Sequence, residues 1–441
     1  MIYLLLILLI CLDIFVYILF DRNILSPSVI GITMFVVSTF LAVLYKNKWD
    51  YAFHISTVLI IITALMFLSA GELLVRLNLH RYSQFRYINY KENEAINISF
   101  IKILFILIIF SLLLIIYYKD TVRLACEAGY KKGQGVLMLA YARIGQLNEK
   151  GKFHPRSRFC NYTFTFIKCI AYVFTYIFLY NKIVCKQKHC FKYLLPFFLF
   201  IPYVVLTTGR TEFIYIAVLW IILGSCFFMQ TKQWNPRYTF KIVKIALVGI
   251  FLFFVAFILA GMQRSSTLGE HVFDTIAAYV GGSIPSLDYY FNEYNSSPNE
   301  YFGQHTLFGI YDFVRIFDKS IPKFYKPYDF VYFNSFGGNV YSIIRRYHQD
   351  FGFFGLYFMM FFLGVFYSLF FLCVNNSRKN SKLLLYTMFF SPIVEMSIEE
   401  RFFMNVISWG SINITIFLII IFRLFVKSNK KWKQIIFTYK E

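Results

Sequence analysis

Long apolar runs recur along the whole chain, and they constrain its fold more than any other feature. A hydrophobic stretch of about eighteen or more residues with few charges is long enough to cross a bilayer as a helix. The sequence predicts about eleven such spans, within a range of about ten to twelve, and hence an all-α, polytopic transmembrane helical bundle. The predicted spans are 2–20, 27–45, 52–71, 98–118, 163–180, 193–208, 211–229, 242–261, 353–374, 383–397 and 405–425.

A polar window, 262–352, interrupts this pattern. It holds seven Lys or Arg against nine Asp or Glu, a net charge of −2 in a chain whose net charge is +21. Lys and Arg gather in the cytoplasmic loops of membrane proteins, and the tail after Phe425 is strongly basic. We therefore expect a cytoplasmic C-terminus and one large extracytoplasmic loop, 262–352, of re-entrant or amphipathic helices. This loop belongs to a single integral membrane domain, 1–441.

Two N-terminal segments also bear on topology. The first apolar run, 1–20, has no basic leader and no small-residue cleavage site, so it is interpreted as a retained helix and not a signal peptide. Residues 119–162 hold nine Lys or Arg against three acids, which favours the cytoplasmic side. Counting spans places the same residues outside. Either a crossing or half-crossing is missing from the prediction, or one N-terminal span does not cross.

The net charge and the spacing of the cysteines bear on whether the chain binds nucleic acid or a metal. Basic cytoplasmic loops account for the positive charge of a membrane protein, so the composition argues against nucleic acid. Cys185 and Cys190 lie close together beside His189, but a zinc site usually needs two such pairs. We expect no metal and no cofactor.

The junction of two spans carries a candidate anion site in Thr207-Thr208-Gly209-Arg210-Thr211-Glu212. A charge in lipid is costly, so Arg210 should lie at the interface or face a polar cavity. Its guanidinium offers a planar fork of donors that matches phosphate, and a helix starting near Thr211 would add N–H groups. The alternative is an arginine that only reaches the interface.

A second cluster lies in Gly337–Gly355, directly before a predicted span. If this stretch is helical, Arg345 and His348 share a face, and Arg346 and Asp350 pair at a spacing of four residues. Two cations, an imidazole and a carboxylate at a membrane surface can bind a diphosphate and move a proton. The alternative is an interfacial anchor of basic and aromatic residues.

A third stretch, Tyr279–Phe291, combines Gly281, Gly282 and Pro285 with Asp288, which suits a turn or a broken helix. Downstream, apolar residues recur at helical spacing and predict an amphipathic helix on the membrane surface: Leu307, Ile310, Phe313 and Phe317. The Tyr, Phe, Asn and acidic residues of this window suit a carbohydrate. The alternative is a plain packed cap.

In layout and in three motifs the chain resembles the membrane oligosaccharide repeat-unit polymerases, the Wzy-type polymerases of O-antigen and capsular polysaccharide. The resemblance in layout covers the whole chain. The motifs are Gly209-Arg210, the stretch Gly281–Asp288, and Asn339-Val340-Tyr341 followed by Asp350-Phe351-Gly352 and Gly355.

The resemblance implies a glycosyltransferase-type, metal-independent polymerase in the bacterial cytoplasmic (inner) membrane. Its substrate would be an oligosaccharide on undecaprenyl diphosphate, and it would transfer the growing glycan onto a new repeat unit. The diphosphate would contact Arg210, Arg345 and Arg346, and His348 or Asp350 would accept the proton. The sugar would contact the loop residues Asp288, Asn339 and Tyr341. A chain-length regulator protein is left open as a partner.

Two alternatives share this lipid-linked substrate. A flippase, which is a transporter, would need two similar halves and no dominant external loop, and no internal duplication is visible. An O-antigen ligase would use the same donor with a different acceptor. A channel or receptor is a third possibility, but arginine clusters at two edges of the loop argue against it.

Overall fold

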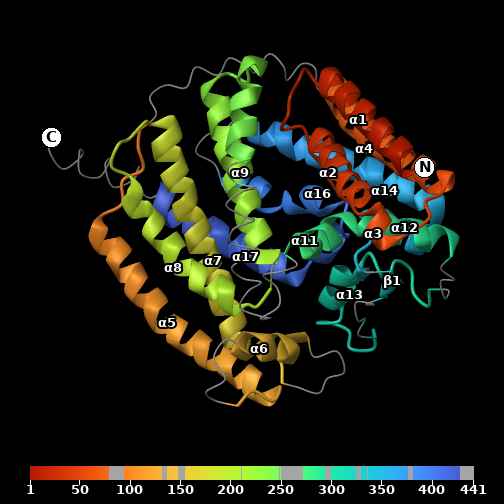
Figure 1. Ribbon diagram of the computed structural model, residues 1–441. Helices are drawn as coiled ribbons and strands as arrows, with labels where there is room; N and C mark the ends of the chain where they lie inside the picture. The colour runs from red at the N-terminus through yellow and green to blue at the C-terminus, as the bar shows by residue number, and fades with distance from the viewer. Residues whose placement is uncertain are drawn as a thin grey trace.

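The computed structural model describes residues 1–78, 94–131, 137–147, 154–209, 211–247, 249, 272–293, 299–322, 324, 329–334, 336–375 and 381–427. Over these residues the chain is almost entirely helical (Figure 1), and eight helices are long and apolar enough to cross a membrane. They are Ile2–Leu19, Pro27–Leu44, Ile55–Asn78, Phe100–Glu127, Arg158–Val184, Thr211–Thr231, Ile343–Cys373 and Trp409–Val426. The predicted all-α, multi-pass class is confirmed.

The elements used below follow the chain from the N-terminus. They are α1 (Ile2–Leu19), α2 (Pro27–Leu44), α3 (Lys46–Trp49), α4 (Ile55–Asn78), α5 (Phe100–Glu127), α6 (Leu137–Leu147), α7 (Arg158–Leu179), η2 (Tyr180–Val184), η3 (Phe191–Leu194), α8 (Leu195–Leu206), α9 (Thr211–Thr231), η4 (Pro236–Tyr238), α11 (Val272–Gly281), α12 (Ser283–Asn292), α13 (Phe308–Val314), β1 (Val331–Phe333), β2 (Phe336–Gly338), α14 (Ile343–Asn375), α15 (Ser381–Met388), α16 (Ser391–Glu395), η5 (Phe402–Val406), α17 (Trp409–Phe422) and η6 (Arg423–Lys427).

Two predicted spans take another form. The 193–208 span is a shorter apolar helix, formed by η3 and α8 over Phe191–Leu206. The 383–397 span is divided into α15 and α16, with Pro392 in the first turn of α16. Proline has no N–H to continue a helix but suits the first turn of a new one. The 242–261 span lies mostly outside the described residues.

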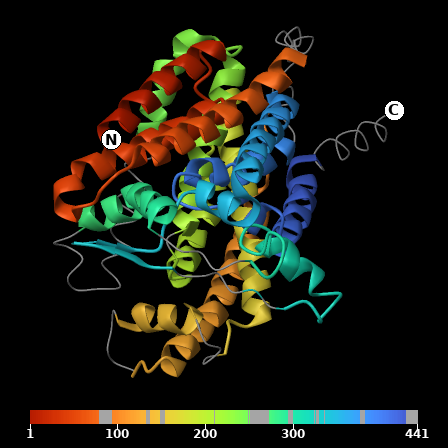
Figure 2. The same ribbon diagram turned by 90° about the vertical axis from the view of Figure 1, so that its right-hand side faces the viewer.

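Helices α4 and α14 cross at two glycines, and Figure 2 shows them side by side. A methyl group at Gly364 would lie 2.0 Å from the carbonyl oxygen of Leu68. One at Gly71 would lie 2.1 Å from the carbonyl oxygen of Phe361. The two backbones are therefore in direct contact, which is how small residues bring helices together in a membrane.

Replacing Gly364 by alanine is expected to lower the free energy of unfolding by about 3 kcal/mol, because the added methyl group forces the two backbones apart. Gly224, inside α9, is the matched control, since no atom lies within 4 Å of its Cβ position. Gly224→Ala should leave the stability unchanged or raise it slightly. The measurement is unfolding of the purified protein in detergent, and equal effects of the two substitutions would contradict this account.

The described part of 262–352 contains three short helices, a hairpin and the first turns of α14. The Gly281–Asp288 stretch is a broken helix, as predicted, because α11 ends at Gly281 and α12 begins at Ser283. The predicted amphipathic helix is the short α13, whose Gly309 packs against the backbone of η5. The antiparallel pair β1–β2, which sequence reasoning did not predict, contacts the N-terminal region where Asn334 N donates to Trp49 O at 3.2 Å.

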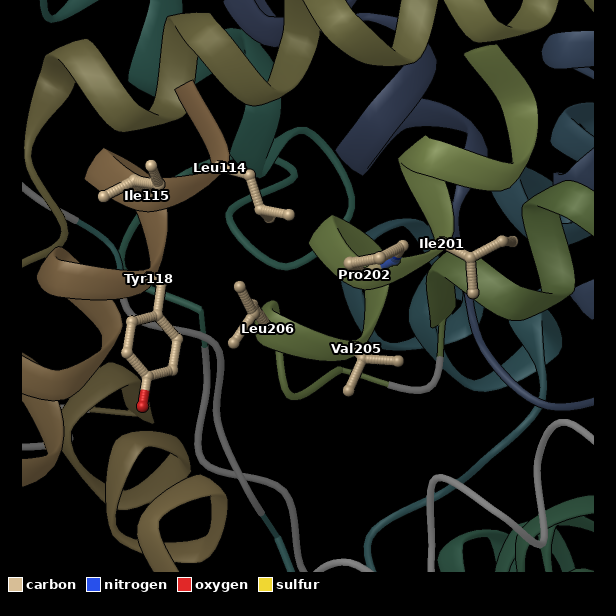
Figure 3. Close-up of a pocket in the computed structure, with 7 residues that line it drawn as sticks. All are labelled: Leu114, Ile115, Tyr118, Ile201, Pro202, Val205 and Leu206. Carbon is tan, nitrogen blue, oxygen red and sulfur yellow. The ribbon is translucent and has the colours of Figure 1, made fainter. Parts of the chain in front are cut away.

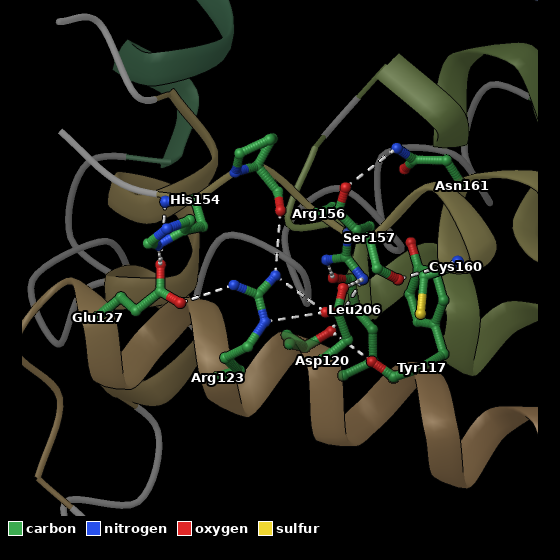
Figure 4. Close-up of polar contacts among 12 residues, drawn as sticks. Tyr117, Asp120, Arg123, Glu127, His154, Arg156, Ser157, Cys160, Asn161 and Leu206 are labelled. Carbon is green, nitrogen blue, oxygen red and sulfur yellow. Dashed lines mark hydrogen bonds and ion pairs between the residues drawn. The ribbon is translucent and has the colours of Figure 1, made fainter. Parts of the chain in front are cut away.

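The described residues of the basic segment 119–162 lie at the end of the bundle where α8 ends, since Arg156 and Gln146 contact Leu206 and Thr208. Figure 4 shows Arg123 bound between Asp120 and Glu127, with N···O distances of 3.0 and 2.6 Å. Arg156 stacks on Tyr117 and donates to the carbonyl of Leu206 at 3.2 Å. Part of the basic charge of this segment is therefore paired within it, and the segment shares one end of the bundle with the α8–α9 junction.

Candidate functional site

The first turns of α14 carry four of the predicted site residues. Gly352 separates these turns from the rest of the helix, with φ of 64° and ψ of −167°. Such a conformation is accessible to glycine and strained for other residues, which explains the glycine in Asp350-Phe351-Gly352. The kink lets Ile343–Phe351 pack into the protein while the remainder of α14 runs on as a membrane span.

Arg345 is fully enclosed, with 1% of its surface exposed. Its guanidinium forms an ion pair with Asp329 and lies 3.8 Å from the ring centroid of Tyr341 and 5.2 Å from that of Tyr290. A cation between two aromatic rings and a carboxylate is firmly held. These contacts favour a structural role for Arg345, and Tyr341 lies buried beneath it.

Arg346 is also buried but more loosely paired. Its Nε lies 3.5 Å from Oε1 of Glu399, and its Nη1 donates to Gln349 Oε1 at 3.4 Å. Close charge-assisted N–H···O bonds measure about 2.7–2.9 Å, so neither contact is tight. Arg346 therefore keeps hydrogen-bonding capacity for an anionic ligand.

The partner of Arg346 belongs to a charged segment that the sequence analysis missed. Glu395, Glu399 and Glu400 are buried, and Arg401 lies 3.4 Å from Glu395 through its Nε. Charged residues between two apolar stretches are costly in a membrane protein and commonly functional. The run Glu399-Glu400-Arg401 was therefore the available signal. Together with Arg346 these residues form what we call the buried charge layer: Arg346, Glu395, Glu399, Glu400 and Arg401.

Glu400 serves the local backbone. Its two carboxylate oxygens accept from the N–H groups of Phe403 at 2.8 Å and Met404 at 3.1 Å, at the start of η5. Burial raises the pKa of this carboxyl from its ordinary 4.5 to about 7, although the two N–H groups act in the opposite direction. Glu400 thus titrates near neutral pH inside the charge layer.

Aromatic side chains surround His348. Its Nδ1 is 3.0 Å from the hydroxyl of Tyr290, and its ring packs against Phe353 and Phe291 at centroid distances of 4.4 and 5.0 Å. Tyr290 also lies beneath Arg345. Arg345 and His348 therefore contact the same tyrosine, as expected of two residues on one face of the helix.

Asp350 binds a turn and does not pair with Arg346 as expected. Its carboxylate accepts from the backbone N–H groups of His305 at 3.1 Å and Thr306 at 2.5 Å, and from Asn299 Nδ2 at 3.0 Å. The backbone donors satisfy the carboxylate, so Arg346 turns to Glu399 instead. These contacts favour a positioning role for Asp350 over proton transfer.

The turn held by Asp350 brings a second imidazole to the site. Thr306 Oγ1 donates to the carbonyl of Arg346 at 3.1 Å, so the turn lies against the first part of α14. Burial lowers the pKa of His305 below its ordinary 6.5, Asp350 opposes this, and the charges of Arg346 and Arg345 lower the pKa further. A neutral imidazole beside two arginines can accept a proton.

The geometry of Gln304 fixes which ring nitrogen of His305 accepts. Gln304 Oε1 accepts from Tyr301 N, so its Nε2 is the donor, and that nitrogen lies 3.1 Å from His305 Nε2. The Nε2 of a neutral His305 therefore carries the lone pair. Sequence reasoning missed His305 because its closeness to α14 depends on contacts between residues about 45 positions apart.

The remaining predicted site residues are distributed around this centre. Asp288 accepts from His54 N at 2.9 Å, His54 Nδ1 at 2.8 Å and Thr57 Oγ1 at 2.6 Å, and so joins α12 to the start of α4. These contacts favour a structural role. Asn339 is half-buried in the connection from β2 to α14. Arg210 lies outside the described residues.

The structure describes the residues on either side of Arg210, and those at the start of α9 lie close to the charge layer. Lys168 on α7 forms an ion pair with Glu212 at 2.7 Å. One turn along α9, the hydroxyl of Tyr215 accepts from Asn405 Nδ2 at 3.1 Å. The start of α9 is therefore adjacent to the segment that carries Glu399 and Arg401.

Two apolar cavities of about 510 Å³ each lie between the helices. Figure 3 shows one between α5 and α8, lined by Leu114, Ile115, Tyr118, Ile201, Pro202, Val205 and Leu206. The second, which we call the α2–α9 cavity, is bordered by α2, α9, α11, the helical residues 239–247 and Val394–Ile398. Glu395 and Ile398 line it, so this cavity borders the buried charge layer.

The fold and the site together define a multi-pass, all-α membrane protein with a buried layer of ion pairs, one residue of which, Glu395, lines an apolar cavity. Among the described residues no group of His, Cys, Asp and Glu could hold a metal ion. Comparison with protein families, with curated proteins and with solved structures finds no match to this chain.

Proposed function

We propose that this protein polymerises oligosaccharide repeat units carried on undecaprenyl diphosphate into a surface polysaccharide, an O-antigen or a capsule. The observation that carries the proposal is the buried, loosely paired Arg346 in a charge layer whose Glu395 lines an apolar cavity. An enzyme that handles a lipid diphosphate needs cations within reach of the membrane and a water-poor place for the lipid. The resemblance to Wzy-type polymerases supplies the identity of the substrate.

The reaction forms one bond and breaks one. A hydroxyl oxygen of the new repeat unit attacks the anomeric carbon of the growing chain, and the bond from that carbon to the diphosphate oxygen breaks. The electron pair leaves with undecaprenyl diphosphate, and the hydroxyl proton passes to an imidazole, His305 or His348. Guanidinium groups neutralise the leaving diphosphate, so the proposal requires no metal.

The location follows from the substrate. Lipid-linked repeat units reach the outer face of the bacterial cytoplasmic membrane, so 262–352 would lie on that face with the C-terminus in the cytoplasm. The α13 helix and η5 pack together, which gives the charge layer and the predicted loop a common end of the bundle. The partners are the bilayer and the lipid-linked oligosaccharide.

Substitution of Arg346 tests the proposal. In a deletion strain complemented with Arg346→Gln, the ladder of surface glycan should collapse to single repeat units at normal protein level, because the leaving diphosphate loses its counter-charge. Arg423→Gln removes one positive charge from an exposed position and should keep the full ladder. A full ladder from Arg346→Gln would overturn the assignment of this arginine.

The same strain separates the alternative functions. Single repeat units present on the surface mean that transport and ligation persist and polymerisation is lost. If Arg346→Gln abolishes every capped species, single units included, the chain acts as a flippase or a ligase and the proposal is wrong.

A further inference from the structure

The hairpin β1–β2 carries a pair of stacked aromatic rings on its exposed face. Phe330 and Tyr332 are 54% and 76% exposed, their ring centroids lie 6.0 Å apart and their planes are inclined by 19°. Side chains two positions apart on a strand project from the same face, so the two rings form one surface. We call this pair the aromatic platform. Exposed apolar rings that lie together, unlike rings scattered singly, mark a binding surface.

The opposite face of the hairpin fixes it to the helical bundle. Val331, between the two rings in sequence, is buried, and the ring of Phe333 packs edge-on against Tyr51 with a centroid distance of 6.0 Å. The turn is held by the hydrogen bond from Asn334 N to Trp49 O. The platform therefore has a fixed support, and a ligand that binds to it loses little free energy in ordering it.

Gly337 lets the ring of Tyr332 rest on the hairpin backbone. The two residues are paired directly across the strands, and a Cβ atom at Gly337 would lie 2.7 Å from Cδ1 of Tyr332. An aromatic ring that covers a cross-strand glycine stabilises a sheet. The glycine therefore positions the ring of Tyr332, and a side chain at this place would displace the ring.

The platform is continuous with the candidate site. Asp329 directly precedes Phe330 and forms the ion pair with Arg345, which is the neighbour of Arg346 in α14. The second strand of the hairpin leads through Asn339 into the first turns of α14. One strand thus begins at a contact of the site, and the other strand ends beside it.

From these observations we infer that the aromatic platform binds sugar residues of the growing glycan, next to the site of transfer. The inference rests on the proposed function and adds to it a glycan site on the hairpin. The C–H groups on one face of a sugar ring carry a partial positive charge, and the face of an aromatic ring is negative, so the two stack. The sequence analysis assigned the sugar to Asp288 and Tyr341, but both are buried in contacts within the protein.

The neighbours of the platform favour a glycan over a membrane surface, which also takes exposed Phe and Tyr. A carboxylate, Asp329, lies at one end of the first strand, and the exposed Asn334 lies at the other. Both side-chain types bond to hydroxyl groups. The window 262–352 carries a net negative charge, which repels the phosphates of lipid headgroups.

A glycan held on the platform would remain at the protein between transfers. After each transfer the old undecaprenyl diphosphate leaves, and the chain then hangs from the lipid of the newest repeat unit. Sugar residues stacked on the platform keep that chain bound until the next unit arrives. The platform should therefore set how many units are added before release, and the transfer reaction itself does not require it.

The first test is the length of the surface glycan in a deletion strain complemented with the double variant Phe330→Ala/Tyr332→Ala. The ladder should persist, but its modal length should fall at least about twofold at normal protein level, because faster dissociation ends elongation earlier. The double variant Phe330→Tyr/Tyr332→Phe keeps both rings and should give the wild-type length. Phe273→Ala removes a ring that is 80% exposed on α11 and should also leave the length unchanged.

The second test measures binding directly. The strain's own polysaccharide, released from its lipid by mild acid, is titrated into the full-length protein in detergent and followed by saturation-transfer NMR. Phe330→Ala/Tyr332→Ala should weaken binding at least about tenfold, since two stacking contacts are lost. Unchanged binding and ladder length in this variant would overturn the inference. Equal shortening in Phe273→Ala would mean that exposed rings act by seating the protein in the bilayer, which overturns it as well.

Failure of the platform and failure of the function are distinct outcomes. If the deletion strain keeps its full ladder, the proposed function is wrong, and binding of the released polysaccharide alone decides whether the hairpin is a glycan site. If the ladder needs the protein but both its length and glycan binding survive loss of the two rings, the function stands and the inference is wrong.

Discussion

Replacing His305 by glutamine is expected to lower the rate of repeat-unit transfer by about a hundredfold, because general-base catalysis contributes about 10²–10⁴-fold. The His305 imidazole lies among Asp350, Arg346, Arg345 and Asp329, whose charges act on it. His348 instead packs against Phe353 and Phe291. His348→Gln should therefore cost less than about tenfold.

The pH dependence distinguishes a base from a structural residue. The pKa of His305 lies below 6.5, so wild-type kcat should stay constant at neutral pH. It should decrease at pH values below that pKa, where the imidazole becomes protonated. His305→Gln should lack this acidic limb. His154→Gln, at a strongly exposed histidine, serves as the control for kcat and its pH profile. A near-normal rate with an intact acidic limb in His305→Gln would assign the base elsewhere, and collapse in His348→Gln would place it there.

Glu400→Gln is expected to change how stability depends on pH. The pKa of Glu400 is raised from 4.5 to about 7 in the folded protein, so the folded state binds the proton more tightly than the unfolded state. The contribution of Glu400 to wild-type stability should therefore be complete below about pH 4.5 and be lost as pH rises through about 7. At about 1.4 kcal/mol per pKa unit, the difference is on the order of 3 kcal/mol.

The measurement is denaturation of the purified protein in detergent between pH 4 and pH 8. Glu400→Gln should lose most of the decline, because a neutral amide has no proton to release. Glu293→Gln, at an exposed glutamate, should keep the wild-type profile. If Glu400→Gln follows the same slope as wild type, the buried carboxyl is not the group that titrates.

The sequence predicted the fold class well because hydropathy and length are local properties. All eight long apolar helices extend over most of a predicted span, and one of them, Ile343–Cys373, begins ten residues before the predicted 353–374 span. The division of 383–397 was not predicted, since hydropathy does not register Pro392. The hairpin β1–β2 was missed because three-residue strands carry no periodic signal.

The candidate site was predicted in part. The cluster on α14 was found from its spacing, and the kink at Gly352 explains its glycine. The partners were not found, because ion pairs such as Arg346 with Glu399 join residues distant in sequence. Asp350 illustrates the limit: its spacing from Arg346 suggested a pair, but the backbone N–H groups of His305 and Thr306 take its carboxylate.

The length of α5 has a consequence for how the protein lies in the bilayer. Its 28 residues extend about 42 Å, whereas the hydrocarbon layer is about 30 Å thick. About two turns therefore stand beyond the lipid tails, and these turns carry Asp120, Arg123 and Glu127, which bind one another and Arg156. This charged end resists being drawn into a thicker membrane, so it is expected to limit how deeply this end of the bundle is immersed.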